Sequence, residues 1–241
     1  MTLFEKFLSG EGFDLEQIQS IDDPQFGRIE KSDMHSYRSK MRSFLNEYEI
    51  VFINSIENEI RIIEEIEVLF KQGTQKILLP VCTVFEKNKQ GKAIRLYYSS
   101  YPYSKKHKIR PRILPADHSL LFPKPVEIYQ AGLAEGDLKK VLNVFTDNAT
   151  VREPSGGEFT STNKSALKEF YSFLFSFGGG APLEHCTETT SGNSTALEYN
   201  IVKVGTYDFS PQAGIAVYDW SGSKLTAARI YDDFEPPVNA T

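Results

Sequence analysis

The sequence predicts an α+β protein in which a curved antiparallel sheet packs on helices. The stretch that predicts it best is residues 183–235, which contains four expected strands at 183–190, 195–204, 213–220 and 225–233. These segments alternate apolar and polar side chains and are rich in β-branched and aromatic residues. Gly, Asn, Ser and Pro, which are typical of turns, separate them. Helical periodicity precedes this stretch and also occurs in the first half of the chain, which completes the α+β pattern.

The first half is predicted to open with a helical leader over residues 1–35, in which Asp14 caps a short helix. Apolar residues then recur at helical spacing over residues 36–47. Residues 60–71 are predicted to form another helix, because isoleucines recur there at helical spacing with glutamates between them, and Gly73 follows as a C-cap. Strands are expected over residues 48–54, 76–86 and 93–102, the last two joined as a hairpin.

A proline-rich segment over residues 111–124 is interpreted as a linker, because prolines exclude a continuous helix or a central strand. Asp137 and Asn163 then stand where helix N-caps are expected. Ahead of its sheet, the second half is predicted to contain helices over residues 126–133, 138–145 and 164–177 and a short two-stranded element at 148–154 and 157–160.

Length and composition are those of a globular protein. The chain has 241 residues, of which 40% are hydrophobic and 24% are charged, and these proportions are ordinary for a folded protein. No apolar run approaches the roughly 20 residues that span a bilayer, and the first residues are too acidic for a signal peptide. The sequence therefore predicts a cytoplasmic protein that does not enter a membrane.

Charge and residue spacing exclude several functions. The net charge is −5, and the basic cluster at residues 105–112 is interrupted by proline, as in a solvated loop; nucleic-acid binding is therefore not expected. Cys82 and Cys186 lie far apart, as expected for reduced, buried thiols. The four histidines show no metal-ligand spacing, and no phosphate-binding or dinucleotide motif is present, so neither a metal nor a cofactor is expected.

The two halves share an order of elements and some letters. Leu-Pro-Val-Cys-Thr at 79–83 matches Leu-Glu-His-Cys-Thr at 183–187, so that their cysteines align. Further along the same alignment, Tyr97 falls on Tyr199. We interpret the pattern as a diverged duplication with a shortened first copy, against the alternative that the match is a coincidence.

Residues 124–236 carry the pattern of a known superfamily. Its parts are Tyr-Gln-Ala-Gly-Leu-Ala-Glu-Gly-Asp at 129–137, Asn-Ala-Thr-Val-Arg-Glu-Pro at 148–154, Ala-Leu-Lys-Glu-Phe-Tyr at 166–171 and Ala-Arg-Ile-Tyr-Asp-Asp at 228–233. With these residues the second half resembles the nuclear transport factor 2-like superfamily, which includes ketosteroid isomerases and SnoaL-type polyketide cyclases.

The resemblance implies a cystatin-like cone, in which a bent sheet wraps around helices and leaves a pocket at its open end. The chain would hold two such cones in tandem: a shortened one over residues 36–110 and a complete one over residues 125–236, with a tail at 237–241. Because many such domains pair through their sheets, two copies in one chain would form an internal pseudo-dimer, or separate chains would self-associate.

The resemblance also implies chemistry. Enzymes of this superfamily commonly use a carboxylate in an apolar cone to move a proton next to a carbonyl group, and burial raises the pKa of such a carboxylate towards the working pH. The residues expected to be catalytic are Asp232, Asp233, Glu198 and His185. The residues expected to bind substrate are Tyr129, Arg152, Glu153, Asn200, Tyr218, Arg229 and Tyr231.

Each of these candidates also has an ordinary structural interpretation. Strand alternation puts Glu198 and Asn200 on one face of the sheet and Tyr199 on the other, so the candidates do not all line one cavity. An ion pair is the alternative role of Glu198 and Arg229, a hydrogen-bonded sheet position that of His185, and a solvated strand end that of the two aspartates.

Two functions remain open from the sequence. The first is cofactor-free proton transfer, of an isomerase, cyclase or dehydratase type, on a small apolar carbonyl compound. The second is a non-catalytic module that binds a lipophilic ligand or a protein. The first half is expected to be structural in either case.

Overall fold

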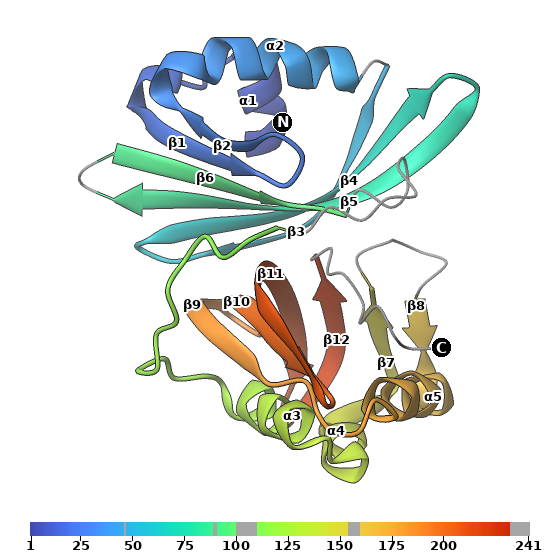
Figure 1. Ribbon diagram of the computed structural model, residues 1–241. Coiled ribbons are helices and arrows are strands. Elements are labelled where there is room, and N and C mark those ends of the chain that lie inside the picture. Colours follow the sequence, from blue (N-terminus) through green and yellow to red (C-terminus); the bar gives the residue numbers. More distant parts are fainter. Residues whose placement is uncertain (46, 89–90, 100–109, 154–159, 232–241) are drawn as a thin grey trace. The chain divides into compact units, whose positions relative to one another are not determined.

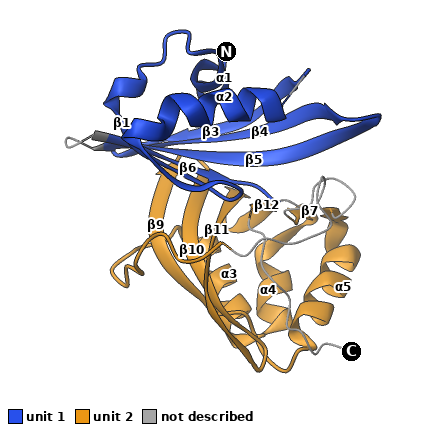
Figure 2. Ribbon diagram, turned by 45° about the horizontal axis from the view of Figure 1, so that its top comes forward, with its two compact units in different colours: residues 1–107 blue, residues 108–241 orange. Residues whose placement is uncertain are grey.

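The computed structural model describes residues 1–45, 47–88, 91–99, 110–153 and 160–231 (Figure 1). The chain divides into two compact units, Met1–His107 and Lys108–Thr241, which Figure 2 shows in different colours. Each unit consists of one six-stranded sheet and its helices. The predicted fold class, two α+β domains with curved sheets, is confirmed.

Unit 1 contains α1 (Leu3–Ser9), η1 (Leu15–Gln17), β1 (Ile18–Asp23), β2 (Gly27–Glu30), η2 (Lys31–Asp33), α2 (Met34–Phe44), β3 (Glu49–Glu57), β4 (Arg61–Gln72), β5 (Gln75–Asn88) and β6 (Gly91–Tyr97). Its sheet has the order β2-β1-β6-β5-β4-β3. Neighbouring strands are antiparallel except β1 and β6, which are parallel. Both helices, α1 and α2, lie on one face of this sheet (Figure 1).

Unit 2 contains α3 (Lys124–Glu135), α4 (Leu138–Val144), β7 (Phe145–Arg152), β8 (Thr160–Thr162), α5 (Asn163–Phe175), β9 (Leu183–Ser191), β10 (Ser194–Val204), β11 (Tyr207–Ser221) and β12 (Lys224–Ile230). Its sheet has the order β8-β7-β12-β11-β10-β9, again with one parallel pair, β7 and β12. The four strands predicted for the end of the chain and the three helices before them are confirmed.

The core of each unit lies between the sheet and its helices. We call this side of the sheet the inner face and the opposite side the outer face. In unit 1 the strand residues Ile66, Val68 and Phe70 join the helix residues Tyr37 and Met41 in one buried cluster. In unit 2 the corresponding cluster is formed by the inner residues of β7, β10, β11 and β12 and by α3, α4 and α5.

The predicted helix caps of unit 2 are confirmed by hydrogen bonds. The Asp137 carboxylate accepts the backbone N–H of Lys140 at 2.9 Å and starts α4. The Asn163 side chain accepts the N–H of Ser165 at 3.0 Å in the first turn of α5. These caps fix where α4 and α5 begin.

Two secondary-structure predictions for unit 1 are wrong. The expected helical leader contains β1 and β2 over residues 18–30, and these strands belong to the sheet. The strand pattern is not visible in the sequence because the polar residues Ser20, Asp22 and Asp23 are buried, so that polar and apolar residues do not alternate. The expected boundaries of the cones, at residues 36–110, 111–124 and 125–236, stay predictions.

The other wrong prediction is the helix over residues 60–71, which is strand β4. Its inner residues follow strand spacing, but Glu64 and Glu65 are buried, so that apolar and acidic letters no longer alternate. Glu64 accepts the backbone N–H groups of Leu3 and Phe4 at 2.9 and 3.1 Å, and these are orphan donors at the start of α1. A carboxylate is thus placed inside the unit to cap a helix that lies far away in the sequence.

The strand registers show that the two units are copies of each other. Glu65 of β4 pairs with Asn54 and Cys82, and Glu198 of β10 pairs with Thr187 and Ile215. Residues of β3, β4 and β5 correspond to those of β9, β10 and β11 at a constant offset in sequence as far as Val68 and Ile201, beyond which the register of β10 with β11 shifts. Even a β-bulge is repeated: Ile53 on β3 and Cys186 on β9 are the extra residues at the same place.

The duplication is therefore real, but the alignment drawn from the sequence is two strands out of step. Cys82 corresponds to Ile215 and not to Cys186, and Tyr97 corresponds to Tyr231 and not to Tyr199. The shortened first cone stays a prediction, although the sheet of unit 1 has the same six strands as that of unit 2 within the described residues and ends on β6.

The true repeat includes an ion pair on the outer face of each sheet. Ala-Ile-Arg-Leu-Tyr at 93–97 corresponds to Ala-Ala-Arg-Ile-Tyr at 227–231. Arg95 bonds Glu86 at 2.5 Å, and the equivalent Arg229 bonds the equivalent Asp219 at 2.6 Å. This match is visible in the sequence, but the alignment was set instead by the Cys-Thr pairs that the two halves share.

Glu64→Gln is expected to destabilise unit 1 by roughly 1–3 kcal/mol. The side-chain NH₂ of the glutamine would face one of the two backbone N–H groups of Leu3 and Phe4, and that N–H would lose its acceptor. Urea unfolding measures the loss, with Glu59→Gln in an exposed turn as the control. Faster hydrogen exchange at the amides of Leu3 and Phe4 should accompany it. Equal stability of the two variants would contradict the capping role.

Candidate functional site

The inner face of unit 2 is the candidate site, since it combines polar groups with an apolar core. On β10, Leu197 and Tyr199 face the helices, whereas Glu198 and Asn200 point to the outer face. The alternation expected from the sequence therefore divides the predicted site residues into two groups, of which Tyr129, Tyr218, His185 and Glu153 belong to the inner face.

Tyrosine hydroxyls form the polar centre of this face. Tyr129 of α3 and Tyr171 of α5 share a hydrogen bond of 3.0 Å between their hydroxyl oxygens. The Gln130 side-chain amide donates to the hydroxyl of Tyr218 on β11 at 2.9 Å. Burial raises the pKa of both Tyr129 and Tyr171, so these phenols remain protonated at neutral pH and keep hydrogen-bond donors inside the apolar core.

Glu153 follows the last residue of β7. Val151 belongs to the inner core, so strand alternation places Glu153 on the same face two residues later. Pro154 comes next, and a residue before proline keeps an extended backbone. Its side chain is half-buried and makes no hydrogen bond or ion pair to the described part of the chain. Burial raises the pKa of the Glu153 carboxyl.

At the equivalent position of unit 1, the carboxylate of Asp23 accepts several hydrogen bonds. The parallel pairs Asp22–Arg95 and Arg152–Arg229 align β1 with β7, which makes Asp23 the counterpart of Glu153. The structure leaves Asp23 only 2% exposed.

The Asp23 carboxylate accepts four hydrogen bonds. The backbone N–H groups of Gln25 and Phe26 donate at 2.7 and 2.8 Å, and the hydroxyls of Tyr37 and Tyr98 donate at 2.7 and 2.9 Å. Such a set holds the carboxylate in one position, whereas the described residues provide no such set for Glu153. The two copies thus keep one acidic position but bond it differently.

His185 lies on the inner face at the other side of the sheet. It pairs with Tyr199 across the ladder, and its ring lies 4.8 Å from that of Phe122, measured between centroids. Its Nε2 atom is buried and has no hydrogen-bond partner within the described residues. Burial lowers the pKa of His185 to about 4, so the imidazole is neutral at pH 7.

The remaining described candidates lie on the outer face and are bonded there. Glu198 accepts the Thr187 hydroxyl at 2.7 Å. The Asn200 amide donates to the carbonyl of Leu114 at 3.2 Å. The guanidinium of Arg152 lies 4.7 Å from the ring centre of Tyr231, and Arg229 bonds Asp219. The structure therefore does not bring these residues together with the inner group. Asp232 and Asp233 lie outside the described residues.

The sequence does not identify two residues that contact the inner-face candidates, Gln130 beside Tyr218 and Phe122 beside His185. Gln130 and Phe122 were not predicted, and no spacing singles them out. The acid–proline dipeptides were a usable signal: Ile-Asp-Asp-Pro at 21–24 and Val-Arg-Glu-Pro at 151–154 end the equivalent strands.

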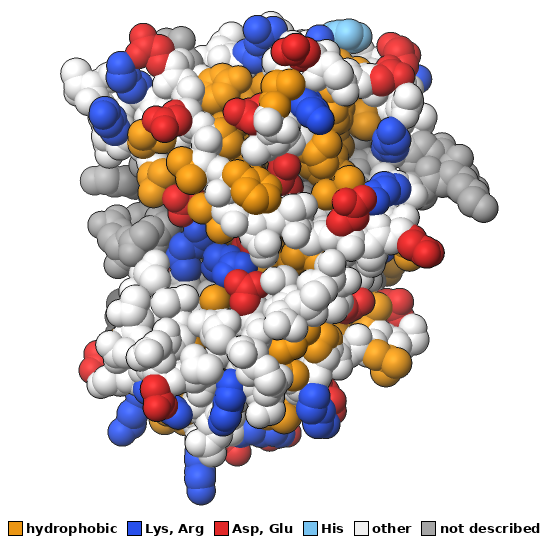
Figure 3. All heavy atoms as spheres, turned by 180° about the vertical axis from the view of Figure 1, so that it is seen from behind, with side chains coloured by type: hydrophobic (Ala, Val, Ile, Leu, Met, Phe, Trp, Pro, Cys, Tyr) orange, Lys and Arg blue, Asp and Glu red, His pale blue; other side chains and the backbone are white. Residues whose placement is uncertain are grey.

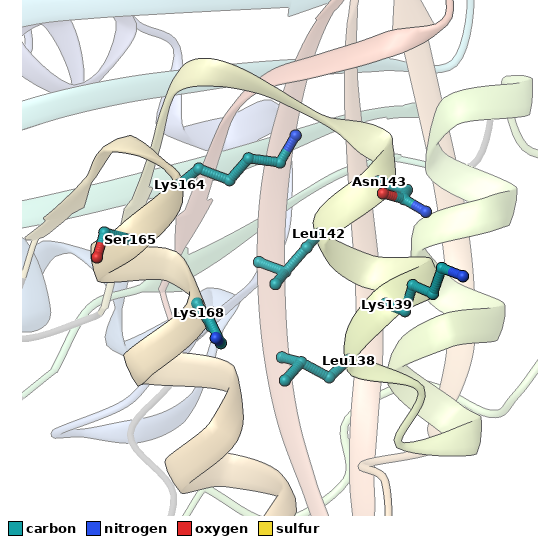
Figure 4. Close-up of a pocket in the computed structure, with 7 residues that line it drawn as sticks. All are labelled: Leu138, Lys139, Leu142, Asn143, Lys164, Ser165 and Lys168. Atoms are coloured by element: carbon teal, nitrogen blue, oxygen red, sulfur yellow. The ribbon is translucent and has the colours of Figure 1, made fainter.

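Two surface hollows lie elsewhere. A groove of about 590 Å³ between α4 and α5 has Leu138 and Leu142 on its floor and three lysines around it (Figure 4). One of them, Lys164, pairs with Asp147 at 3.3 Å. A hollow of about 370 Å³ lies at the start of β3 in unit 1. Neither contains a predicted site residue. Over the described ranges, no group of three or more His, Cys, Asp or Glu side chains is placed to hold a metal ion.

Comparison with known proteins gives matches among solved structures alone: no family model and no curated protein matches the chain. An NTF2-like protein from Anabaena variabilis is 24% identical, with 46% of this chain and 85% of that chain covered and a TM-score of 0.38. A cystatin-fold protein from Novosphingobium aromaticivorans is 14% identical, with 44% and 93% covered and a TM-score of 0.39.

A protein from Catenulispora acidiphila with a ketosteroid isomerase-like fold, solved in complex with trimethylamine, is 13% identical, with 47% and 88% covered and a TM-score of 0.39. The fold of each unit is defined by its own strand order.

Within the described residues, no helix is long and apolar enough to cross a membrane.

The neutral state of His185 makes stability depend on pH. His185 is protonated below about pH 6.5 in the unfolded state but only below about pH 4 in the folded state. The free energy of unfolding is therefore highest above pH 6.5 and falls as the pH drops from 6.5 to 4. The His185→Phe variant should lack this decrease in the free energy of unfolding, which is roughly 3 kcal/mol at most. Urea unfolding at pH 7.0 and 4.5 tests this, with exposed His35→Phe as the control. The same acid sensitivity in wild type and His185→Phe would contradict a buried, neutral imidazole.

Proposed function

We propose that unit 2 binds a small apolar carbonyl compound at its inner face and that Glu153 transfers a proton there without a cofactor. The observation that carries the proposal is the contrast between the two copies. Asp23 accepts four hydrogen bonds, whereas Glu153 is half-buried, without a described partner and raised in pKa. A carboxyl group with a raised pKa is a better base when ionised and exchanges protons nearer to neutral pH.

The chemistry needs two further features, and the inner face supplies both. The rings of Tyr129, Tyr171 and Phe145 give an apolar environment, in which a carbonyl compound is separated from water. The buried phenols are protonated donors, and a donor aimed at a carbonyl oxygen stabilises the negative charge that develops when the neighbouring carbon loses a proton. Glu153 would take that proton and return it to another carbon, as in an isomerisation or a cyclisation.

A non-catalytic ligand-binding module is the second candidate function. It is favoured by the hydrogen bonds that the inner polar groups make to one another, Tyr129 to Tyr171 and Gln130 to Tyr218, because these groups have partners before any ligand binds. In that case Glu153 and His185 would contribute to ligand affinity and not to turnover.

The sites of partner contact stay proposals as well. Self-association through the sheets, or an internal pseudo-dimer, is proposed because the chain contains two equivalent six-stranded sheets. The molar mass in solution, measured by light scattering, distinguishes association between chains from a single chain. A cytoplasmic location is proposed from the sequence alone.

The test starts with a thermal-shift screen of flat apolar ketones, steroids, aromatic polyketides and fatty acids, because a ligand of the native state raises the melting temperature. For a compound that binds and is turned over, Glu153→Gln is expected to lower turnover by roughly 10²–10⁴-fold while the compound still raises the melting temperature.

Asp23→Asn is the matched control, because it changes the equivalent carboxylate of unit 1. It should lower the melting temperature, since a buried acceptor of four hydrogen bonds is altered, and leave turnover by the folded protein unchanged. Unchanged turnover in Glu153→Gln would support the binding module instead. No thermal shift with any compound class would overturn the proposed site.

A further inference from the structure

The surface groove between α4 and α5 has an apolar floor. Leu138 and Leu142 of α4 form this floor, and both are half-buried against the core of unit 2. The groove has a volume of about 590 Å³, which is within the range of ligand-binding clefts. None of the predicted site residues lines it. It is therefore a separate site from the inner face.

Lysines surround the apolar floor. Lys139 comes from α4, whereas Lys164 and Lys168 come from α5, across the groove from the leucines (Figure 4). Lys164 pairs with Asp147 at 3.3 Å, and an exposed pair of this kind contributes little free energy. Lys139 and Lys168 are exposed and make no ion pair or hydrogen bond to the described chain. Lys and Arg side chains also gather on the surface of unit 2 in the lower part of Figure 3.

The carboxylates near the groove leave Lys168 without a described partner. No described Asp or Glu side chain lines the groove. Asp137 caps α4, and Glu135 pairs with Lys140 at 2.9 Å. Glu169 follows Lys168 in the chain, but no bond joins their side chains. The groove therefore places a cation beside an apolar floor, without a described anion to balance it.

In unit 1 an ion pair joins the equivalent elements. The order of elements makes η1 the counterpart of α4, since each connects the first helix of its unit to the first strand. It likewise makes η2 and α2 the counterpart of α5. Lys31 of η2 bonds the carboxylate of Glu16 of η1 at 3.3 Å and the backbone carbonyl of Glu16 at 2.7 Å. In unit 2, leucines take the side of α4 that faces α5, so this carboxylate has no counterpart among the groove residues.

The two lysines of α5 do not stabilise their own helix. The first turn of α5 contains Lys164 and no acidic residue. The start of a helix has a partial positive charge, which repels a cation. Lys164 and Lys168 are one turn apart, and like charges at this spacing also repel each other. A bound anion offsets both effects.

The apolar and the basic side chains follow the groove with the same repeat. Leu138 and Leu142 are four residues apart on α4, and Lys164 and Lys168 are four residues apart on α5. Four residues of helix extend about 6 Å. A partner helix has rows of side chains with this repeat, so it can match both rows at once. A fatty acid has a single anionic head group, which leaves one of the two lysines unmatched.

We propose that the groove between α4 and α5 binds an acidic amphipathic helix of a partner protein. The apolar side chains of that helix lie on Leu138 and Leu142, and its carboxylates face the two lysines of α5. They take the place that Glu16 has beside its lysine in unit 1. Binding of an amphipathic helix in an apolar groove is a common mode of peptide recognition.

The probe is a fluorescein-labelled peptide about four helical turns long, with leucine at helical spacing and glutamate beside each leucine. Fluorescence anisotropy with the full-length protein measures binding, and amide chemical shifts locate it. We expect saturable binding below about 1 mM peptide and shifts at residues 138–143 and 164–168. Added salt should weaken binding, because the charges lie at the surface.

Two control peptides separate charge from helical pattern. One has lysine in place of every glutamate, and the other has the same composition with its leucines moved off helical spacing. Each should bind more weakly by roughly tenfold or more, because the first repels the lysines of α5 and the second cannot place its leucines on the floor.

Lys168→Glu should weaken binding of the acidic peptide by roughly tenfold or more, because a carboxylate then faces those of the peptide. Lys40→Glu is the matched control, since Lys40 is an exposed lysine of α2 and its substitution changes the net charge equally. This variant should bind like wild type. Equal melting temperatures of the two variants verify that both are folded.

Three results would overturn the proposal. The first is the absence of shifts at residues 138–143 and 164–168 at about 1 mM peptide. The second is equal binding by Lys168→Glu and wild type, or equal binding of the acidic peptide and its off-spacing control. The third is tighter binding of decanoate than of the peptide, with shifts at the same residues, because the occupant would then be a fatty acid.

Discussion

In each unit, a parallel ladder joins the first strand of the sheet to its last strand, β1 to β6 and β7 to β12. The chain reaches this pairing only after four intervening strands, so the ladder fixes the order of the whole sheet. It also places the residue after the ladder, Asp23 or Glu153, on the inner face beside the helices. The curvature of the sheet, the packing of the helices and the position of the acidic group all depend on it.

The same scaffold therefore presents the same kind of group in two electrostatic settings. Unit 1 surrounds Asp23 with two tyrosine hydroxyls and a tight turn, which holds it as part of the structure. Unit 2 places its tyrosine hydroxyls against one another and leaves Glu153 half-buried, with no hydrogen-bond donor to it among the described residues. A duplicated chain can in this way keep one copy for stability while the other retains a group able to exchange protons.

The sequence predicted the strands of unit 2 because their inner and outer residues differ in polarity, as the alternation around Tyr199 shows. It mispredicted β4 because Glu64 is buried to cap α1, a contact between residues sixty-one positions apart that no local pattern reports. The repeat was recognised, but its register was set by the letters Cys-Thr, whereas hydrogen bonding aligns Arg95 with Arg229.

The candidate site was predictable only in part, for a physical reason. Alternation tells which residues share a face, and it grouped Glu198 with Asn200 correctly. It does not tell which face the helices cover, because that depends on packing between distant segments. Tyr129 and Tyr218 could be expected inside as large aromatic residues, whereas the bonding that separates Glu153 from Asp23 needs the folded chain.

The most direct measurement is the pKa of the Glu153 side chain, from a carbon-detected NMR titration of the carboxyl group with Glu153→Gln as the assignment control. The account predicts a value above the 4.5 of a solvated glutamate, because burial disfavours the charged form and no described donor offsets it. A value at or below 4.5 would show that Glu153 is solvated or accepts hydrogen bonds as a carboxylate, and would contradict its role in proton transfer.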